Sequence, residues 1–165
     1  MAQHATEFEP WAMVFEPRIV FSVYGLPITQ GSKKAFLSRS TGRAIAVEDN
    51  KSSLLKWRTA VRVKAIHAMG SPMMLEGPVS VRFDFTVRKP VSAPKRTRTY
   101  PSKKPDLDKL TRAICDALTQ AQAYGDDGQI VDLYATKSYP GETLYALSEP
   151  GVAITVRSLQ GWGQG

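Results

Sequence analysis

Residues 78–88, PVSVRFDFTVR, alternate apolar and polar side chains throughout, and this segment most restricts how the chain can fold. A period of two predicts a β-strand with Val79, Val81, Phe83, Phe85 and Val87 facing inward and the residues between them facing outward. Such a strand needs a sheet to join and another layer to cover its apolar face. The rest of the chain supplies both.

The remaining periodic segments predict five further strands and two helices. Residues with apolar spacings of three and four predict the helices, and short apolar runs bounded by turn residues predict the strands. The predicted strands cover 18–25, 129–139 and 151–159, with a hairpin of 35–39 and 43–49 around a turn at 40–42, and the helices cover 50–69 and 107–122. This order indicates a small mixed sheet with two main helices in a single domain, of the α/β class with α+β as the alternative.

The ends of the chain and one internal segment lack this periodicity. We expect a flexible tail over 1–17, a domain over 18–159 containing a mobile basic loop at 88–104, and a second tail over 160–165. No stretch approaches the ~20 apolar residues of a membrane span. Cys115 is the only cysteine, which excludes an internal disulfide and a cysteine-based zinc site. We therefore expect a cytoplasmic protein with no membrane partner and no small-molecule cofactor.

The net charge of +7 predicts a polyanionic partner, although many small basic proteins bind nothing acidic. The charges are segregated: Glu76 and Asp84 are the only acids between residues 50 and 105, whereas residues 106–132 contain six aspartates. The cations before and within the acidic part would bind DNA phosphates, with Tyr100 as a candidate stacking ring; a solvated loop without a partner is the alternative. These cations are Arg88, Lys89, Lys95, Arg96, Arg98, Lys103, Lys104 and Lys137.

Aspartates lie at both ends of the predicted helix 107–122. Asp106 and Asp108 can point the same way only where the chain is still extended, at the start of the helix, and Pro105 favours such a start. Asp126 and Asp127 lie on the turn at the other end, so they meet the first pair only if the chain folds back. Carboxylates that converge repel each other unless a cation bridges them, and oxygen ligands alone favour Mg²⁺ or Mn²⁺.

The same acids also have a purely structural interpretation. Asp106 is a suitable N-cap, and Asp108, Arg112 and Asp116 have the spacing of a solvated ion-pair stripe. Asp126 and Asp127 precede a glycine, as turn residues often do. In that case the chain would be a DNA-binding module without catalysis.

Taken together, the motifs of residues 104–137 resemble the signature of the RusA-type Holliday junction resolvases. The elements of that signature are an Asp-Leu-Asp that opens a helix, a DAL within it, and Asp-Asp followed by Gln and two apolar residues. They occur here at 106–108, 116–118, 126–127 and 129–131. The resemblance implies a Mg²⁺-dependent endonuclease, common in phages and prophages, that acts as a homodimer on four-way DNA junctions in recombination and repair.

The resemblance also implies roles for individual residues. Asp106, Asp108 and Asp127 would be the metal-binding catalytic acids, with Asp126 as their substitute or as a turn residue. Arg112 stands where the family usually has lysine; it can hold a phosphate but cannot transfer a proton. Paired cuts favour a two-fold dimer. A flap- or nick-specific nuclease on the same fold is the alternative within the enzymes.

Overall fold

The computed structural model describes residues 18–31, 33–37, 44–48, 51–71 and 74–160. Its main sheet has four strands in the order β1–β6–β4–β5. The central strands are β4 (Val79–Thr86) and β6 (Gly151–Ser158), which pair antiparallel, and β1 (Arg18–Tyr24) pairs antiparallel with β6. At the other edge, β5 (Ile130–Ser138) pairs parallel with β4.

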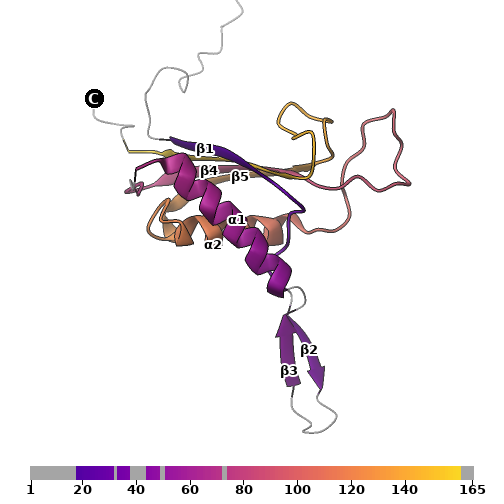
Figure 1. Ribbon diagram of the computed structural model, residues 1–165, viewed down its shortest axis with the longest axis horizontal. Helices are drawn as coiled ribbons and strands as arrows, with labels where there is room; N and C mark the ends of the chain where they lie inside the picture. Colours follow the sequence, from indigo (N-terminus) through magenta and orange to yellow (C-terminus); the bar gives the residue numbers. More distant parts are fainter. Residues whose placement is uncertain (1–17, 32, 38–43, 49–50, 72–73, 161–165) are drawn as a thin grey trace, which may run out of the picture.

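Two helices, α1 (Lys51–Met69) and α2 (Leu107–Gln120), cover one face of this sheet (Figure 1). α2 lies in the crossover between β4 and β5, because parallel strands cannot be joined by a tight turn. The core forms where apolar residues of β4 meet the buried faces of the helices. These residues include Val81, Phe83 and Phe85 from β4, Trp57 and Val61 from α1, and Leu110, Ile114 and Leu118 from α2.

The predicted hairpin is present as a separate two-stranded sheet. β2 (Lys33–Leu37) and β3 (Ala44–Glu48) pair antiparallel. The turn predicted at 40–42 lies outside the described residues. In Figure 1 this hairpin projects away from the main sheet, beyond the start of α1.

The second face of the sheet is less exposed than the alternating pattern of β4 predicted. Asp84 and Thr86, expected to face solvent, are buried. The reason is that the segment between β5 and β6 folds over this face, where the amide of Leu147 donates to Thr86 Oγ1 at 2.9 Å. In α1, the residues spaced three and four apart, Leu54, Trp57, Val61 and Ala65, are buried, and Met69 packs against the core at the end of the helix.

The mixed sheet with two main helices in one domain is confirmed, and the arrangement belongs to the α+β class. The proposed tails at 1–17 and 160–165 lie outside the described residues, apart from Gln160. None of the helices described here has the length and apolar character needed to cross a membrane.

Candidate active site

The start of α2 presents two carboxylates, one on the extended N-cap residue and one in the first helical turn. Asp106 occupies the N-cap position with φ −74° and ψ 129°, so the chain is still extended there. Within the described residues its side chain caps no helix amide; instead Lys109 Nζ lies 2.9 Å from Asp106 Oδ2. This contact lowers the pKa of Asp106, which therefore stays ionised at neutral pH. Asp108 is exposed in the first turn, where the helix dipole favours negative charge.

Lys137 on β5 fixes the backbone that leads into this helix. Its ammonium group donates to the carbonyl oxygens of Lys103 at 2.8 Å and Pro105 at 2.9 Å. The sequence pattern proposed Lys137 as a DNA contact, but these bonds hold the chain directly before Asp106. Lys137 thus links the sheet to the position of the first carboxylate pair.

At the far end of α2, a short 3₁₀ turn, η2 (Asp127–Gln129), positions Asp127. The Asp126 carboxylate accepts from Gly128 N at 2.7 Å and caps this turn. Asp127 Oδ1 accepts from Thr119 Oγ1 at 2.6 Å. The turn therefore holds Asp127 against the last turn of α2, while Asp126 is used within the turn itself.

The three predicted catalytic acids do not come together within one chain. Thr119, which holds Asp127, lies three helical turns beyond Asp108, or roughly 16 Å at ~1.5 Å per residue. Among the described residues, no group of three or more acids, histidines or cysteines could hold a metal ion. The acids are separated because the chain reverses at η2, beside the C-terminal end of α2, and Asp127 lies in that turn. The strand β5 then runs back to the start of α2, but the residue that it places there is Lys137.

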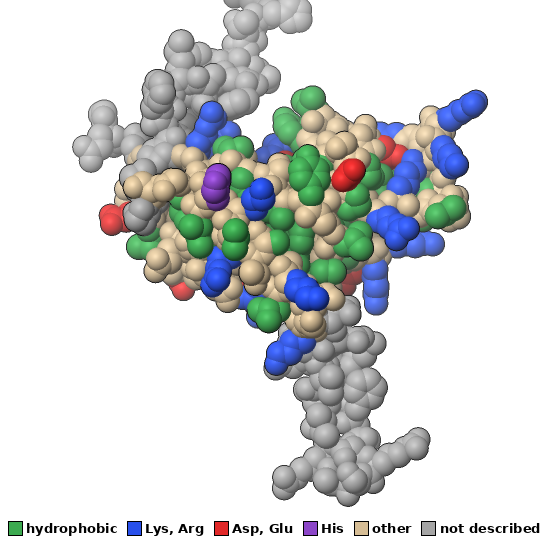
Figure 2. All heavy atoms as spheres, viewed as in Figure 1, with side chains coloured by type: hydrophobic (Ala, Val, Ile, Leu, Met, Phe, Trp, Pro, Cys, Tyr) green, Lys and Arg blue, Asp and Glu red, His purple; other side chains and the backbone are tan. Residues whose placement is uncertain are grey.

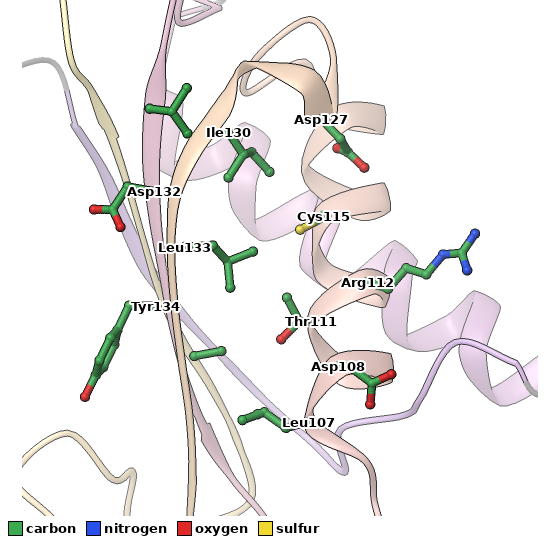
Figure 3. A pocket seen from close by; sticks show the side chains of 12 residues that line it. Leu107, Asp108, Thr111, Arg112, Cys115, Asp127, Ile130, Asp132, Leu133 and Tyr134 are labelled. Carbon is green, nitrogen blue, oxygen red and sulfur yellow. The ribbon is translucent and has the colours of Figure 1, made fainter.

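A groove of about 830 Å³ runs between α2 and β5 and joins the two ends (Figure 3). Leu107, Ile130 and Leu133 point into it, so its floor is mainly apolar. Asp108, Arg112 and Asp127 lie along the outer side of α2. The groove therefore carries an acid at each end with a guanidinium group between them.

Two other side chains of α2, those of Cys115 and Asp116, have structural surroundings that give them no catalytic role. Burial, followed by the charge of Asp127, raises the pKa of Cys115 to about 12, so its thiol remains protonated and unreactive. Asp116 pairs with Arg58 of α1 at 3.5 Å. Asp116 therefore joins the two helices and does not extend a solvated stripe through Arg112.

The predicted basic segment 88–104 extends from the sheet, and its cations gather at one end of the molecule with few acids among them (Figure 2). Two of its residues are linked to the segment between β5 and β6. Lys89 forms an ion pair with Glu142, and the amide of Thr99 donates to Glu142 Oε2 at 3.2 Å. The other predicted DNA contacts in this segment, Arg88, Lys95, Arg96, Arg98, Lys103 and Lys104, are exposed.

Sequence reasoning missed two features of the site. Gln129 binds four backbone groups around the turn that carries Asp127. Arg82 lies between the rings of Tyr134 and Tyr145 on the second sheet face. The glutamine in the QIV motif was a signal for the first, whereas the second joins residues far apart in the chain and has no local signal.

The chain is similar to one protein family and to one bacterial protein. A family model described as "Endodeoxyribonuclease RusA" matches residues 27–157, which include both helices, the strands β2 to β5, and β6 except for its last residue. A protein of Bacillus subtilis (strain 168), described as "Uncharacterized protein YqaN", is 31% identical over 152 residues. The matched part covers 86% of this chain and 96% of that protein.

Proposed function

This chain belongs to the RusA endodeoxyribonuclease family, and from that premise we propose that it hydrolyses phosphodiesters at four-way DNA junctions with the carboxylates at the two ends of α2. The family implies Holliday junction resolvase activity on branched DNA. The observation that carries the proposal for this chain is the groove with Asp108 at one end and Asp127 at the other. The exposed cations of residues 88–104 lie on the segment that leads into the start of α2, which is the Asp108 end of the groove (Figure 1).

The donor set fits a divalent cation. Asp106, Asp108 and Asp127 offer oxygen ligands, and the groove between them supplies no imidazole, so Mg²⁺ or Mn²⁺ suits these ligands better than zinc. A bound ion of this kind supplies an activated water and stabilises negative charge on the phosphodiester. Arg112 offers a guanidinium group that can hold a phosphate oxygen in two hydrogen bonds.

The separation of the acids along α2 supports a dimer as the complete enzyme. A two-fold axis that passes beside the middle of α2, perpendicular to the helix, would set two copies of it side by side and antiparallel. Asp127 of one subunit would then lie beside Asp106 and Asp108 of the other, at two equivalent sites. Two such sites are what paired cuts in a junction require.

The surface around the groove suits such an interface. β5 is an edge strand, and its residues Val131 and Leu133 are 65% and 47% exposed. Exposed apolar residues on an unpaired edge favour association with another chain. A second copy placed over α2 and β5 would bury Val131 and Leu133. It would also cover the apolar floor of the groove.

The test is cleavage of a synthetic four-way junction by the wild type and by Asp108→Asn, with Mg²⁺ or with EDTA. We expect the wild type to cut in Mg²⁺ alone, and the variant to cut at least ~10²-fold more slowly, as for other groups that stabilise developing charge. Junction binding should stay nearly intact in the variant. A panel of flaps, nicked duplexes and single strands, run in parallel, separates junction cutting from a flap- or nick-specific activity.

Asp132→Asn is the matched control. Asp132 borders the groove on β5, but its side chain lies on the opposite side of the strand from that of Leu133, where it accepts from Ser80 Oγ at 2.9 Å (Figure 3). It should cut at the wild-type rate. Normal cutting by Asp108→Asn would remove the acids of α2 from the mechanism, and cutting by the wild type in EDTA would remove the metal.

A further inference from the structure

A second pocket, of about 290 Å³, lies on the sheet face opposite the helices. Residues of β4 and β5 form its base, and the segments before α2 and after β5 form its walls. We call it the tyrosine pocket, after Tyr100, Tyr134 and Tyr145, which line it together with Arg82 and Arg98. Its size is near the lower end of the ~300–1,000 Å³ range of small-ligand sites.

The parallel pairing of β4 and β5 sets the base of this pocket. The register places Arg82 beside Tyr134 and Asp84 beside Thr136. Arg82 donates from Nε to Asp84 Oδ2 at 2.7 Å and from its terminal nitrogen to Oδ1 at 3.2 Å, while Thr136 Oγ1 donates to Asp84 Oδ1 at 2.7 Å. The orientation of the guanidinium group is therefore fixed before any ligand arrives.

This guanidinium group orients two of the rings. It lies 3.9 Å from the ring centre of Tyr145 and 4.7 Å from that of Tyr134, distances typical of cation–π contacts. Even so, Tyr145 and Tyr134 are 52% and 54% exposed, and Tyr100, which carries Arg98 at 4.8 Å, is 71% exposed. Aromatic rings that are both oriented and exposed suit stacking with a flat ligand.

The wall of the pocket offers polar contacts at the edge of such a ligand. Thr99 Oγ1 is buried and has no hydrogen-bond partner among the described residues. A buried hydroxyl group without a partner calls for an explanation, and a polar ligand atom supplies one. Glu142 holds this wall in place through its bonds to Lys89 and to the amide of Thr99.

The pocket is also connected to the catalytic end of α2. Lys137 lines it and donates to the carbonyl oxygen of Pro105, directly before Asp106. Tyr134 lines both this pocket and the groove. A nucleotide held in the tyrosine pocket therefore lies across β5 from the groove whose rim carries the proposed catalytic acids.

We propose that the tyrosine pocket binds one unpaired DNA base at the branch point, an inference that rests on the proposed junction nuclease activity. The exposed rings stack on the base, and Thr99 and its neighbours bond to its polar edge. Cations around the pocket hold the adjoining phosphates. Bases at a branch point have fewer stacking and pairing partners than bases in a duplex, so taking one out of the helix costs less there.

The test compares two DNAs and four proteins by fluorescence anisotropy in EDTA, where no cutting occurs. One four-way junction carries a single unpaired thymine at its branch point, and the other carries an abasic residue in its place. We expect the wild type to bind the thymine junction about tenfold more tightly, within the range that base–aromatic stacking gives. Tyr145→Ala should bind both junctions equally, and Tyr145→Phe should keep the preference because the ring remains.

Tyr24→Ala is the matched control, since Tyr24 is 58% exposed on β1, the opposite edge strand, and its removal should leave the preference unchanged. Equal binding of both junctions by the wild type, or a preference that survives Tyr145→Ala, would overturn the base pocket. Cleavage of the plain junction in Mg²⁺ by the same preparation separates the two proposals. Cutting without a thymine preference removes the pocket alone, whereas a preference without cutting removes the nuclease proposal alone.

Discussion

Gln129 is the residue that determines where Asp127 lies. Its Oε1 accepts from the amides of Gly125 at 2.7 Å and Asp126 at 3.0 Å. Its Nε2 donates to the carbonyl oxygens of Leu75 at 3.1 Å and Gly77 at 2.7 Å. One side chain therefore joins the turn to the segment that precedes β4, and the carboxylate follows from this backbone geometry.

Truncation by Gln129→Ala should lower the free energy of unfolding by about 2 kcal/mol, because four bonds are lost and each contributes ~0.5–1.5 kcal/mol net. Urea unfolding followed by circular dichroism measures this loss. Junction cutting should also slow at temperatures where the variant is folded, because Asp127 loses its support. Gln120→Ala, an exposed change in α2, should alter stability by less than ~0.5 kcal/mol. Wild-type stability of Gln129→Ala would show that the turn forms without this side chain.

At the scale of elements, Glu142 connects the segment between β5 and β6 to the basic segment 88–104. It pairs with Lys89 and accepts a hydrogen bond from the amide of Thr99. The bond from Lys89, supported by the Thr99 amide, lowers the pKa of Glu142. Because the pKa of Glu142 is lower in the folded state, the stabilisation from this ion pair is complete when the pH is above the ordinary pKa of glutamate. It is lost as the pH falls through the lowered pKa of the folded state.

We expect Glu142→Gln to increase hydrogen exchange at the Thr99 amide several-fold at neutral pH, because the local opening becomes easier. The wild type should lose protection at this amide, measured against the intrinsic exchange rate at each pH, only when the solution is acidified below the ordinary glutamate pKa, and the variant should show no such step. Hydrogen exchange with mass spectrometry resolves the peptide around residue 99. Glu149→Gln is the control, since Glu149 lies in the same segment and is exposed. Identical protection in Glu142→Gln and the wild type would contradict the connection.

The elements themselves could be predicted because each has a local signal. The helix predicted at 107–122 is observed at Leu107–Gln120, and the strand predicted at 78–88 is observed at Val79–Thr86. The contacts between elements could not be predicted in this way. Lys137 has the pattern of an exposed strand cation, and only the position of the chain before α2 shows that it binds two carbonyl groups.

The separation of the acids within one subunit could not be predicted for a similar reason. A pattern gives the length of α2 and the presence of a turn after it, but not the direction in which that turn sends the chain. Here the turn is held at Thr119, so Asp127 remains at the end of the helix farthest from Asp106. Asp126 was expected to serve the turn, and its bond to Gly128 is the local geometry that such a pattern can predict.

At the scale of the whole molecule, a mixture of two inactive variants tests the proposed dimer. Asp108→Asn and Asp127→Asn should each be inactive alone. If each site combines the start of α2 from one subunit with Asp127 from the other, a mixed dimer has one doubly altered site and one intact site. Co-refolding equal amounts should therefore restore roughly a quarter of the wild-type sites, since about half of the dimers are mixed.

Nicks in a labelled junction on a denaturing gel measure the restored activity. Because only one site is intact, mixed dimers should cut one strand and leave its counterpart whole. A co-refolded mixture of Asp108→Asn with itself under a second tag provides the control for subunit exchange and should stay inactive. A mixture no more active than either variant would place each complete site within a single subunit.

The length of α2 sets the distance between the carboxylates at its two ends. Adding one turn would preserve the apolar stripe in outline, yet it would lengthen the interval between its terminal carboxylates by about 5.4 Å. In a two-fold pair of antiparallel helices, the start of one helix and the end of the other would move outward together, so the two composite sites would lie about 5.4 Å farther from each other. The hairpin and the surface loops can vary in size without this effect, so insertions should be tolerated least in the helix that separates the proposed catalytic acids.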